Sequence, residues 1–381
     1  MRSGYIDVSL AWLRVLGHAH WWSIQANSSV EKAYRLGFNN TTVNTTGASS
    51  RWNAFPLRCL STVCRYEMGV CYNSGIMPEL PEVETVRRGL KPFILNKKII
   101  QVKPEPGKGF QGSATEVDGA TVTDIRRRGK ALLIDLDNGN TLMIHLRMTG
   151  QLIWRGQNAK VGQLDDAEQF AAGHPSKNFT AELPNSQTRV NFVFVDGNLY
   201  FNDQRKFGFV KVLPTGEVEQ DKFIAELAKE PWQMSAEELY AKCQSHGRSP
   251  IKAVLLNQKL IAGLGNIYAD ESLFYASVHP AMLAGKLSFE QIAKILEGAC
   301  KIMDAAIASG GSTMATYVRP DGSTGDYLER FAQVFRREGK PCPRCGTIIE
   351  KTRCAGRGTH FCPKCQGQPP AKVPVEATER P

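Results

Sequence analysis

Four cysteines near the C-terminus constrain the fold of this chain more than any other feature. Cys342-Pro-Arg-Cys345 and Cys362-Pro-Lys-Cys365 are two C-x-x-C pairs separated by sixteen residues. Each pair can present two thiolates from one tight turn, and zinc binds four such ligands at the corners of a tetrahedron. The spacing therefore predicts a zinc ribbon, a β-hairpin closed at its base by one structural Zn²⁺. Because four thiolates leave no open coordination position, we expect no catalytic role for the metal.

Basic residues surround this predicted ribbon and suit it to binding phosphate groups. They are Arg336, Arg337, Lys340, Arg344, Lys351, Arg353, Arg357 and Lys364. The formal net charge of the chain, +10, also favours a polyanionic partner. Zinc ribbons serve transcription and ribosomal factors as well as enzymes, so this motif indicates nucleic-acid binding without specifying an activity. Cys354 falls in the middle of the hairpin and is not expected to be a ligand.

The overall composition is that of a globular protein rather than a membrane or disulfide-rich one. The chain has 381 residues, enough for two or three domains, and 42% of them are hydrophobic. No run of 18 uncharged apolar residues occurs, so we expect no membrane span. Five of the ten cysteines crowd between positions 342 and 365, which favours a metal site in a reducing compartment over a disulfide framework.

Residues 1–76 differ in character from the rest of the chain. They hold seven Lys/Arg against three Asp/Glu, and Asp7 and Arg14 interrupt what would be the apolar core of a secretory signal. Low acidity and scattered arginines suit an organelle transit peptide. The alternative is that translation starts at Met77 and that 1–76 is upstream sequence read in frame. The composition favours this second interpretation, because it supports no packed fold.

The pattern of apolar residues from Met77 onward predicts an α+β protein. Val83, Val86 and Leu90 predict a helix that starts at about Pro81 and ends near Pro92. Short strands are predicted at 98–103, 120–126, 131–137, 141–147, 190–196 and 198–202, a density that favours an antiparallel β-sandwich over βαβ units. Helices follow at 219–229, 235–245, 249–257, 266–277 and 287–308. We expect a long loop at 155–189 and a disordered tail at 367–381.

A glycine-containing turn lies between two of the predicted helices. Gly263 and Gly265 allow positive φ angles and close backbone approach, and Asn266 is placed to cap the next helix. The free N–H groups at such a helix start attract anions such as phosphate. The same pattern also fits an ordinary helix hairpin, and the sequence leaves both interpretations open.

Several longer motifs resemble those of formamidopyrimidine-DNA glycosylases. They are MPELPEVET (77–85) followed by RRG (87–89), RRGKALLIDL (127–136), HLRMTGQL (145–152), NDQRKFG (202–208), IAGLGNIYADESLF (261–274), GGST (310–313) and the zinc ribbon. They occur in the order typical of the family and span roughly residues 77–366. The resemblance implies a β-sandwich domain with flanking helices at 77–215, a helix–two-turns–helix domain at 216–330 and a zinc ribbon at 331–366.

The resemblance also implies a chemistry. The family removes oxidised purines, 8-oxoguanine and formamidopyrimidines, from double-stranded DNA through a Schiff base on an N-terminal proline. It then cleaves the strand at the abasic site by β,δ-elimination. Pro78 matches the nucleophile and Glu79 the general acid, while Lys130 and Arg357 match the residues that assist catalysis and strand cleavage. Glu82, one helical turn later, is expected to be structural or orienting.

Further positions match the family residues that contact DNA. Met148, Arg205 and Phe207 correspond to the side chains that fill the space left by the extruded base. His145, Lys252 and Asn266 correspond to residues near the phosphates, and 311–325 to a loop that closes over the flipped purine. Gln204 and Lys206 depart from the usual Pro and Arg, and Phe335 and Arg336 from the usual Tyr and Gly.

One obstacle accompanies the implied activity: the extension 1–76 would place the Pro78 nitrogen in an ordinary peptide bond. We therefore expect the functional protein to start at Pro78 and to act as a bacterial-type cytoplasmic monomer without membrane contact. The less favoured alternative is that residues 1–76 target the protein to an organelle. Two alternatives remain, an oxidised-pyrimidine glycosylase of the sister group and a DNA-binding but inactive member that retains 1–76.

Overall fold

The computed structural model describes residues 78–107, 109–160, 168–173, 181–311 and 331–367. The predicted extension 1–76, nearly all of the tail 367–381 and nearly all of the loop 311–325 lie outside the described residues, as does much of the loop 155–189. Within the described ranges, no helix is long and apolar enough to cross a membrane.

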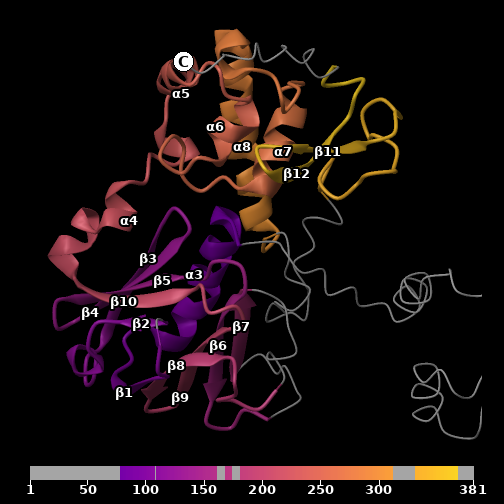
Figure 1. Cartoon of the computed structure of the whole chain (residues 1–381). Coiled ribbons are helices and arrows are strands. Elements are labelled where there is room, and N and C mark those ends of the chain that lie inside the picture. The colour runs from indigo at the N-terminus through magenta and orange to yellow at the C-terminus, as the bar shows by residue number, and fades with distance from the viewer. Residues whose placement is uncertain (1–77, 108, 161–167, 174–180, 312–330, 368–381) are drawn as a thin grey trace, which may run out of the picture. The chain divides into compact units, whose positions relative to one another are not determined.

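Two five-stranded sheets make up the first part of the described chain (Figure 1). One sheet has the strand order β1-β8-β9-β6-β7 and the other β2-β10-β5-β4-β3, and all neighbours are antiparallel except β2 and β10. The strands of the first sheet are β1 (Ile99–Pro104), β6 (Gly150–Gly156), β7 (Gln169–Gly173), β8 (Thr188–Phe194) and β9 (Gly197–Asp203). The strands of the second are β2 (Phe110–Gln111), β3 (Val122–Arg128), β4 (Ala131–Leu136), β5 (Asn140–His145) and β10 (Phe209–Pro214).

Side chains of both sheets and of helix α3 (Leu80–Ile94) share one hydrophobic core. Val83, Val86 and Leu90 lie in this core, as the apolar stripe predicts. The helix does not end near Pro92 but continues to Ile94. A proline in the last turn removes only one backbone hydrogen bond, and the helix closes beyond it through Leu95 N–H donating to the carbonyl of Lys91 at 3.1 Å.

The predicted strands are confirmed, but four further strands of the two sheets were not expected from the sequence, of which the two-residue β2 is the shortest. The predicted loop 155–189 contains β7 and includes the last two residues of β6 and the first two of β8. All five residues of β7 are buried, so its sequence has no alternation of polar and apolar residues to reveal it. β6 and β10 were missed as well, and β6 begins with five consecutive buried positions.

Helices dominate the chain after β10. The predicted helices at 235–245, 249–257, 266–277 and 287–308 are confirmed as α5 (Ala236–Ser245), α6 (Ile251–Leu256), α7 (Asn266–Tyr275) and α8 (Phe289–Ala308). The helix predicted at 219–229 is shorter, because residues Thr215–Gln220 form a 3₁₀ turn and α4 covers only Lys222–Ala225. Helices α5, α6, α7 and α8 share a second core, which also includes Leu80 from the first turn of α3. Helix α3 therefore contributes to both cores.

A two-stranded hairpin, β11 (Glu350–Cys354) and β12 (Arg357–Phe361), completes the described chain (Figure 1). A small core at its base contains Cys342, Cys362 and Ile349 together with Phe274 of α7. The predicted zinc ribbon is thus packed against the helix that follows the glycine turn.

Candidate active site and DNA-contacting residues

The start of α3 is held against the glycine turn that precedes α7. Leu80 N–H donates to the carbonyl of Gly263 at 3.2 Å, and Gly263 has φ +93°, in the region that favours glycine. A Cβ at Gly263 would lie 2.3 Å from Leu80 Cδ1, so a larger residue would push α3 away. Pro78 and Glu79, immediately before α3, are buried at this junction.

The side chain of Glu79 occupies the N-terminus of α7. Its Oε1 accepts a hydrogen bond from Ile267 N–H at 2.9 Å and its Oε2 from Tyr268 N–H at 3.4 Å. A Cβ at Gly265 would lie 2.3 Å from Glu79 Cδ, so glycine is required for the carboxylate to approach. The helix start is therefore an anion site, but the protein's own carboxylate fills it in place of the phosphate that the sequence pattern suggested.

Burial changes the acidity of Glu79. Removal from water raises the pKa of Glu79 to about 7. The nearby charge of Lys130 opposes this rise, and the charge of Glu82 adds to it. Lys130 is also buried, and its Nζ donates to the carbonyl of Leu264 at 2.8 Å. Burial lowers the pKa of Lys130, while Glu79 and Glu82 act to raise it. Without the resemblance, Lys130 would be taken for a surface lysine at a strand edge, but it lies inside the site.

A second carboxylate stands beside Glu79. Glu82 Oε2 accepts a hydrogen bond from Glu79 N–H at 2.9 Å, and its Oε1 accepts one from the hydroxyl of Tyr268 at 2.7 Å. Tyr268 has 0% exposed surface, and nothing in its sequence context singled it out. In the sequence it stands among apolar residues of a helix, and only the docking of α3 on α7 brings its hydroxyl to Glu82.

The tip of the β11–β12 hairpin lies next to the same helix. Asn266 is the first residue of α7 rather than its cap, which is Gly265, and its Nδ2 donates to the carbonyl of Gly358 at 3.0 Å. Arg357 is exposed at the start of β12, and its charge contributes to lowering the pKa of Lys130. Arg357 and Lys130 are thus close enough to interact electrostatically, although 226 positions separate them in the sequence.

Lys252 is placed differently from the other candidate DNA contacts. It has 0% exposed surface, and its Nζ lies 2.6 Å from Asp270 Oδ1 and 2.8 Å from the hydroxyl of Thr359. The other oxygen of Asp270 accepts a hydrogen bond from His360 N–H at 2.9 Å. In this structure the amine of Lys252 therefore joins α6, α7 and β12, and its predicted approach to a phosphate stays a prediction.

Removing Asp270 tests the importance of this buried pair. Asp270→Ala is expected to lower the free energy of unfolding by about 3–5 kcal/mol, because it leaves the Lys252 ammonium buried without its counter-ion. Urea denaturation measures this change. Glu297→Ala is the matched control, since it removes an exposed partner of Lys301 and is expected to cost under about 1 kcal/mol. A loss for Asp270→Ala no larger than that of the control would contradict the assignment.

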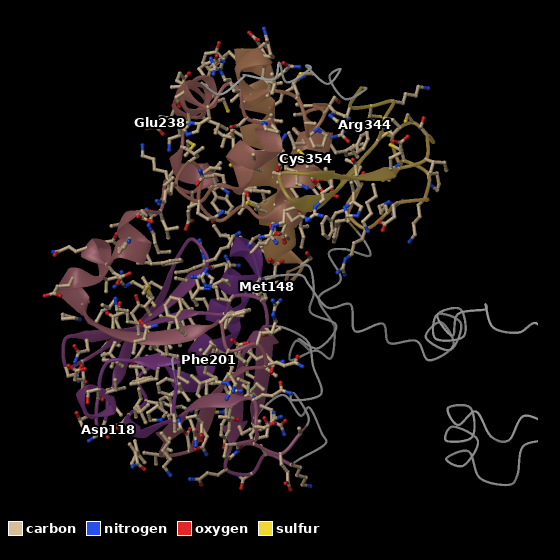
Figure 2. All side chains as sticks on the ribbon, viewed as in Figure 1. Asp118, Met148, Phe201, Glu238, Arg344 and Cys354 are labelled. Carbon is tan, nitrogen blue, oxygen red and sulfur yellow. The ribbon has the colours of Figure 1, made fainter. Side chains whose placement is uncertain are left out.

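The three residues predicted to fill the space of an extruded base come together from two loops. Arg205 Nη1 donates to Met148 Sδ at 3.1 Å, and the Arg205 guanidinium lies 5.1 Å from the ring centroid of Phe207. Phe207 is 59% exposed, so its ring lies at the surface. Buried Asp203 joins the two loops, since its carboxylate accepts from the hydroxyl of Thr149. Met148 is labelled in Figure 2.

His145 lies at the end of β5, and its ring is buried. Its Nδ1 accepts a hydrogen bond from Arg147 N–H at 3.0 Å, and its ring stacks on Phe209 with centroids 5.9 Å apart. Burial, with smaller contributions from Arg147 and Lys130, lowers its pKa to about 3. At neutral pH the His145 ring of the free protein is therefore neutral, with its proton on Nε2, and its predicted phosphate contact stays a prediction.

The four cysteines of the ribbon fit one zinc ion. Their sulfur atoms all lie within 4.8 Å of one another, with Cys342 Sγ 3.9 Å from Cys365 Sγ and Cys345 Sγ 3.5 Å from Cys362 Sγ. Tetrahedral Zn–S bonds of ~2.3 Å place sulfur atoms ~3.8 Å apart, which agrees with these separations. Cys354, labelled in Figure 2, is outside this set, and its Sγ lies 3.6 Å from the carbonyl of Pro280.

Replacing one ligand tests the zinc assignment. Cys345→Ser is expected to reduce the zinc content from one ion per chain to nearly none, because three thiolates cannot close the tetrahedral site. Elemental analysis measures the metal, and cleavage of abasic DNA is expected to fall with it, since the hairpin carries Arg357. Cys354→Ser is the control and is expected to retain the ion. Full zinc content in Cys345→Ser would show that this thiolate is not a ligand.

Comparisons with known proteins agree with this arrangement. Residues 77–210 match the formamidopyrimidine-DNA glycosylase N-terminal domain, 227–318 the H2TH domain of the same enzymes, and 339–367 the zinc finger found in FPG and IleRS. A formamidopyrimidine-DNA glycosylase of Exiguobacterium sp. is 39% identical over 298 residues, which cover 76% of this chain and 99% of that protein. This chain belongs to the formamidopyrimidine-DNA glycosylase family. A glycosylase of the same description from Thermosynechococcus vestitus is 38% identical over 300 residues, which cover 76% of this chain and 97% of the relative.

Solved structures of the same family share the fold. The Lactococcus lactis Fpg bound to abasic-site DNA superimposes with a TM-score of 0.66 at 33% identity, and it covers 76% of this chain and 100% of its own. The same enzyme bound to DNA with an oxidised pyrimidine gives a TM-score of 0.65 at 33% identity, with the same coverage. Because residues from 77 onward match nearly the whole length of such relatives, this part of the chain corresponds to a complete glycosylase fold.

The departures from the family pattern leave the glycosylase fold intact. Arg336 has φ 57°, in the left-handed region, where the family usually has glycine. The ring of Phe335, in place of the usual tyrosine, packs 5.0 Å from the ring of His360. The main-chain N–H of Phe335 donates to Glu271 Oε1 at 2.8 Å, so buried Glu271 holds the segment that leads into the ribbon.

Proposed function

We propose that this chain removes oxidised purines from double-stranded DNA through the amine of Pro78 and then cleaves the strand by β,δ-elimination. The observation that carries the proposal is the buried environment of the Glu79 side chain. This side chain bears a buried carboxyl group with a pKa of about 7, one residue from the proposed nucleophile. Such a group can hold a proton near neutral pH and give it up during the reaction. Relatives bound to Fapy-dG DNA and to abasic-site DNA support the substrate class.

Each residue of the site has a proposed role. The Pro78 nitrogen attacks C1′ of the sugar and the bond from C1′ to the base breaks, so that the base leaves with the bonding electrons and takes up the proton that the attacking amine loses. Glu79 then gives its proton to the ring oxygen as the ring opens. The resulting iminium holds the sugar covalently. Lys130, buried next to Glu79, assists catalysis, and Arg357 at the hairpin tip supports the elimination that follows base loss. Burial lowers the pKa of Lys130, which suits an amine to proton transfer.

The exposed cluster of Met148, Arg205 and Phe207 is proposed to enter the duplex when the lesion is extruded. Two apolar side chains can fill the vacated space, and the guanidinium can pair with the orphaned base. Asn266, His145 and Lys252 are proposed to lie near the phosphates around the lesion. The domain limits 77–215, 216–330 and 331–366 are proposed on the same basis.

The nucleophile imposes a condition on the N-terminus. Pro78 has a reactive amine only as the first residue, so we propose that residues 1–76 are removed or not made. Removal of the initiator methionine before a small residue such as proline would expose this amine. The protein is then expected to act as a monomer in a bacterial-type cytoplasm, since its relatives are bacterial.

Excision assays on three lesion duplexes test the proposal. Protein that starts at Met77 is expected to cleave duplexes with 8-oxoguanine or a formamidopyrimidine faster than a duplex with an oxidised pyrimidine. The reverse order would favour the sister group, for which the L. lactis complex with an oxidised pyrimidine gives a precedent for binding. Retained binding to lesion DNA with no cleavage of any substrate would favour an inactive DNA-binding protein.

A further inference from the structure

Tyr268 is a buried tyrosine whose hydroxyl has a charged partner. The residue belongs to the first turn of α7 and has 0% exposed surface, within the core that joins α5 to α8. Its hydroxyl donates to Glu82 Oε1 at 2.7 Å. A phenylalanine would pack in the same core without a polar group to satisfy, so the hydroxyl needs an explanation beyond packing.

The hydroxyl acts on a carboxylate that is itself attached to the proposed catalytic dipeptide. Glu82 Oε2 accepts the N–H of Glu79 at 2.9 Å, so the two oxygens of Glu82 connect Tyr268 to the main chain of Glu79. Glu82 lies in the first turn of α3 and is 2% exposed. Rotation of this carboxylate would release the main chain immediately after Pro78.

The main chain of Tyr268 also holds the side chain of Glu79. Its N–H lies 3.4 Å from Glu79 Oε2, and the neighbouring N–H of Ile267 lies 2.9 Å from Oε1. One residue of α7 therefore bonds both Glu79 and Glu82, with its backbone to the carboxyl group of Glu79 and with its hydroxyl to that of Glu82. The two bonds fix the Glu79 side chain and the Glu79 backbone independently.

We propose that Tyr268 is a positioning residue for base excision. Tyr268 acts through Glu82 and thereby holds the Pro78–Glu79 dipeptide in its reactive placement. The proposal rests on the proposed function and adds to it a residue whose hydroxyl acts through Glu82 rather than on the sugar or the base. Proton transfer from Glu79 and attack by the Pro78 nitrogen require both groups to keep their placement within a fraction of an ångström. The hydroxyl of Tyr268 supplies that constraint from the helical side of the junction.

The test is Tyr268→Phe in protein that starts at Met77, which corresponds to a complete relative. The single-turnover rate of 8-oxoguanine excision is expected to fall roughly 10- to 100-fold, the value of one hydrogen bond to a charged group. The Kd for lesion DNA is expected to stay within about threefold, because Tyr268 is fully buried. Borohydride trapping at a preformed abasic site is expected to fall less than excision, because it needs the placement of Pro78 but no protonation of the ring oxygen by Glu79.

Tyr275→Phe is the matched control. Tyr275 lies at the last position of α7, and its hydroxyl also donates to a glutamate, Glu297, at 2.9 Å, but on the exposed surface. This variant is expected to keep the excision rate of the parent. Melting temperatures of both variants separate a loss of placement from a loss of folding.

A double-mutant cycle with Glu82→Gln tests whether Tyr268 acts through Glu82. If it does, Tyr268→Phe added to Glu82→Gln is expected to change the excision rate by less than about threefold. Fully additive losses would overturn the proposal. So would an unchanged excision rate in Tyr268→Phe, or equal losses of excision, DNA binding and abasic-site trapping with a lowered melting temperature. A parent protein that traps no abasic DNA would instead overturn the proposed function, and this inference with it.

Discussion

Protein that starts at Met77 is expected to form a borohydride-trapped covalent adduct with abasic DNA, whereas the 381-residue chain is expected to form none. In the full chain the Pro78 nitrogen belongs to a peptide bond, where resonance delocalises its lone pair and removes its basicity. The difference is therefore between a nucleophile and none, and we expect the full chain to give only background trapping. Denaturing gels of the two proteins with the same labelled duplex measure it.

A close control separates the effect of the free amine from that of losing the upstream residues. Protein that begins one residue earlier, with an initiator methionine before Ile76, keeps the fold from residue 77 but leaves the Pro78 nitrogen acylated. It is expected to trap no DNA while binding the duplex as the Met77 protein does. Trapping by this control or by the full chain would show that another amine forms the adduct, with the buried Lys130 the first to examine.

Glu79→Gln is expected to lower the rate of 8-oxoguanine excision by about 10²–10⁴-fold, the usual contribution of a positioned general acid. Glutamine can keep an acceptor at the N-terminus of α7 but has no proton to give. Trapping at a preformed abasic site is expected to survive the substitution, because that step starts from an aldehyde. Excision within about tenfold of the parent rate would remove Glu79 from its proposed role.

The pH dependence of excision provides an independent measure of the same group. Glu79 must be protonated to act as an acid, and burial raises its pKa to about 7, so the active form is lost as pH rises through that value. The Pro78 amine titrates as well, but its contribution cancels when the excision rate is divided by the rate of imine formation at a preformed abasic site. This ratio is expected to fall about tenfold per pH unit above the pKa of Glu79. A ratio that stays constant between about pH 6 and pH 9 would contradict the assignment.

Local patterns in the sequence predicted much of the fold and the metal site. Cys342, Cys345, Cys362 and Cys365 could be assigned from their spacing alone, because each pair of ligands comes from one turn. Six strands and five of the helices were also predicted, since each has its own periodicity or flanking breakers. Strands β6 and β7 escaped because their buried faces leave no alternation, and that burial depends on what packs against them.

The site could be predicted only in part. The resemblance supplied the identities of Pro78, Glu79 and Lys130, but not the environment that gives Glu79 its raised pKa. Tyr268 and Asp270 were missed, since an isolated tyrosine or aspartate in a helix carries no sign of its partner. The buried ion pair of Lys252 with Asp270 was missed as well, and the phosphate contact assigned to Lys252 from its motif stays a prediction.

By itself, the sequence determined the zinc ribbon, the helix that follows Pro78 and the kind of residues available for catalysis. These properties depend on neighbours within a few positions, so spacing and chemistry are enough to infer them. The tertiary structure alone decided that Glu79 fills the N-terminus of α7, that Tyr268 reaches Glu82 and that Arg357 lies close enough to Lys130 to lower its pKa. Each of these depends on the hydrogen bonds that join the start of α3 to α7 and on the packing of β12 against α7, which bring together groups more than 80 positions apart. Burial at that junction turns an ordinary glutamate into a group that can hold a proton near neutral pH.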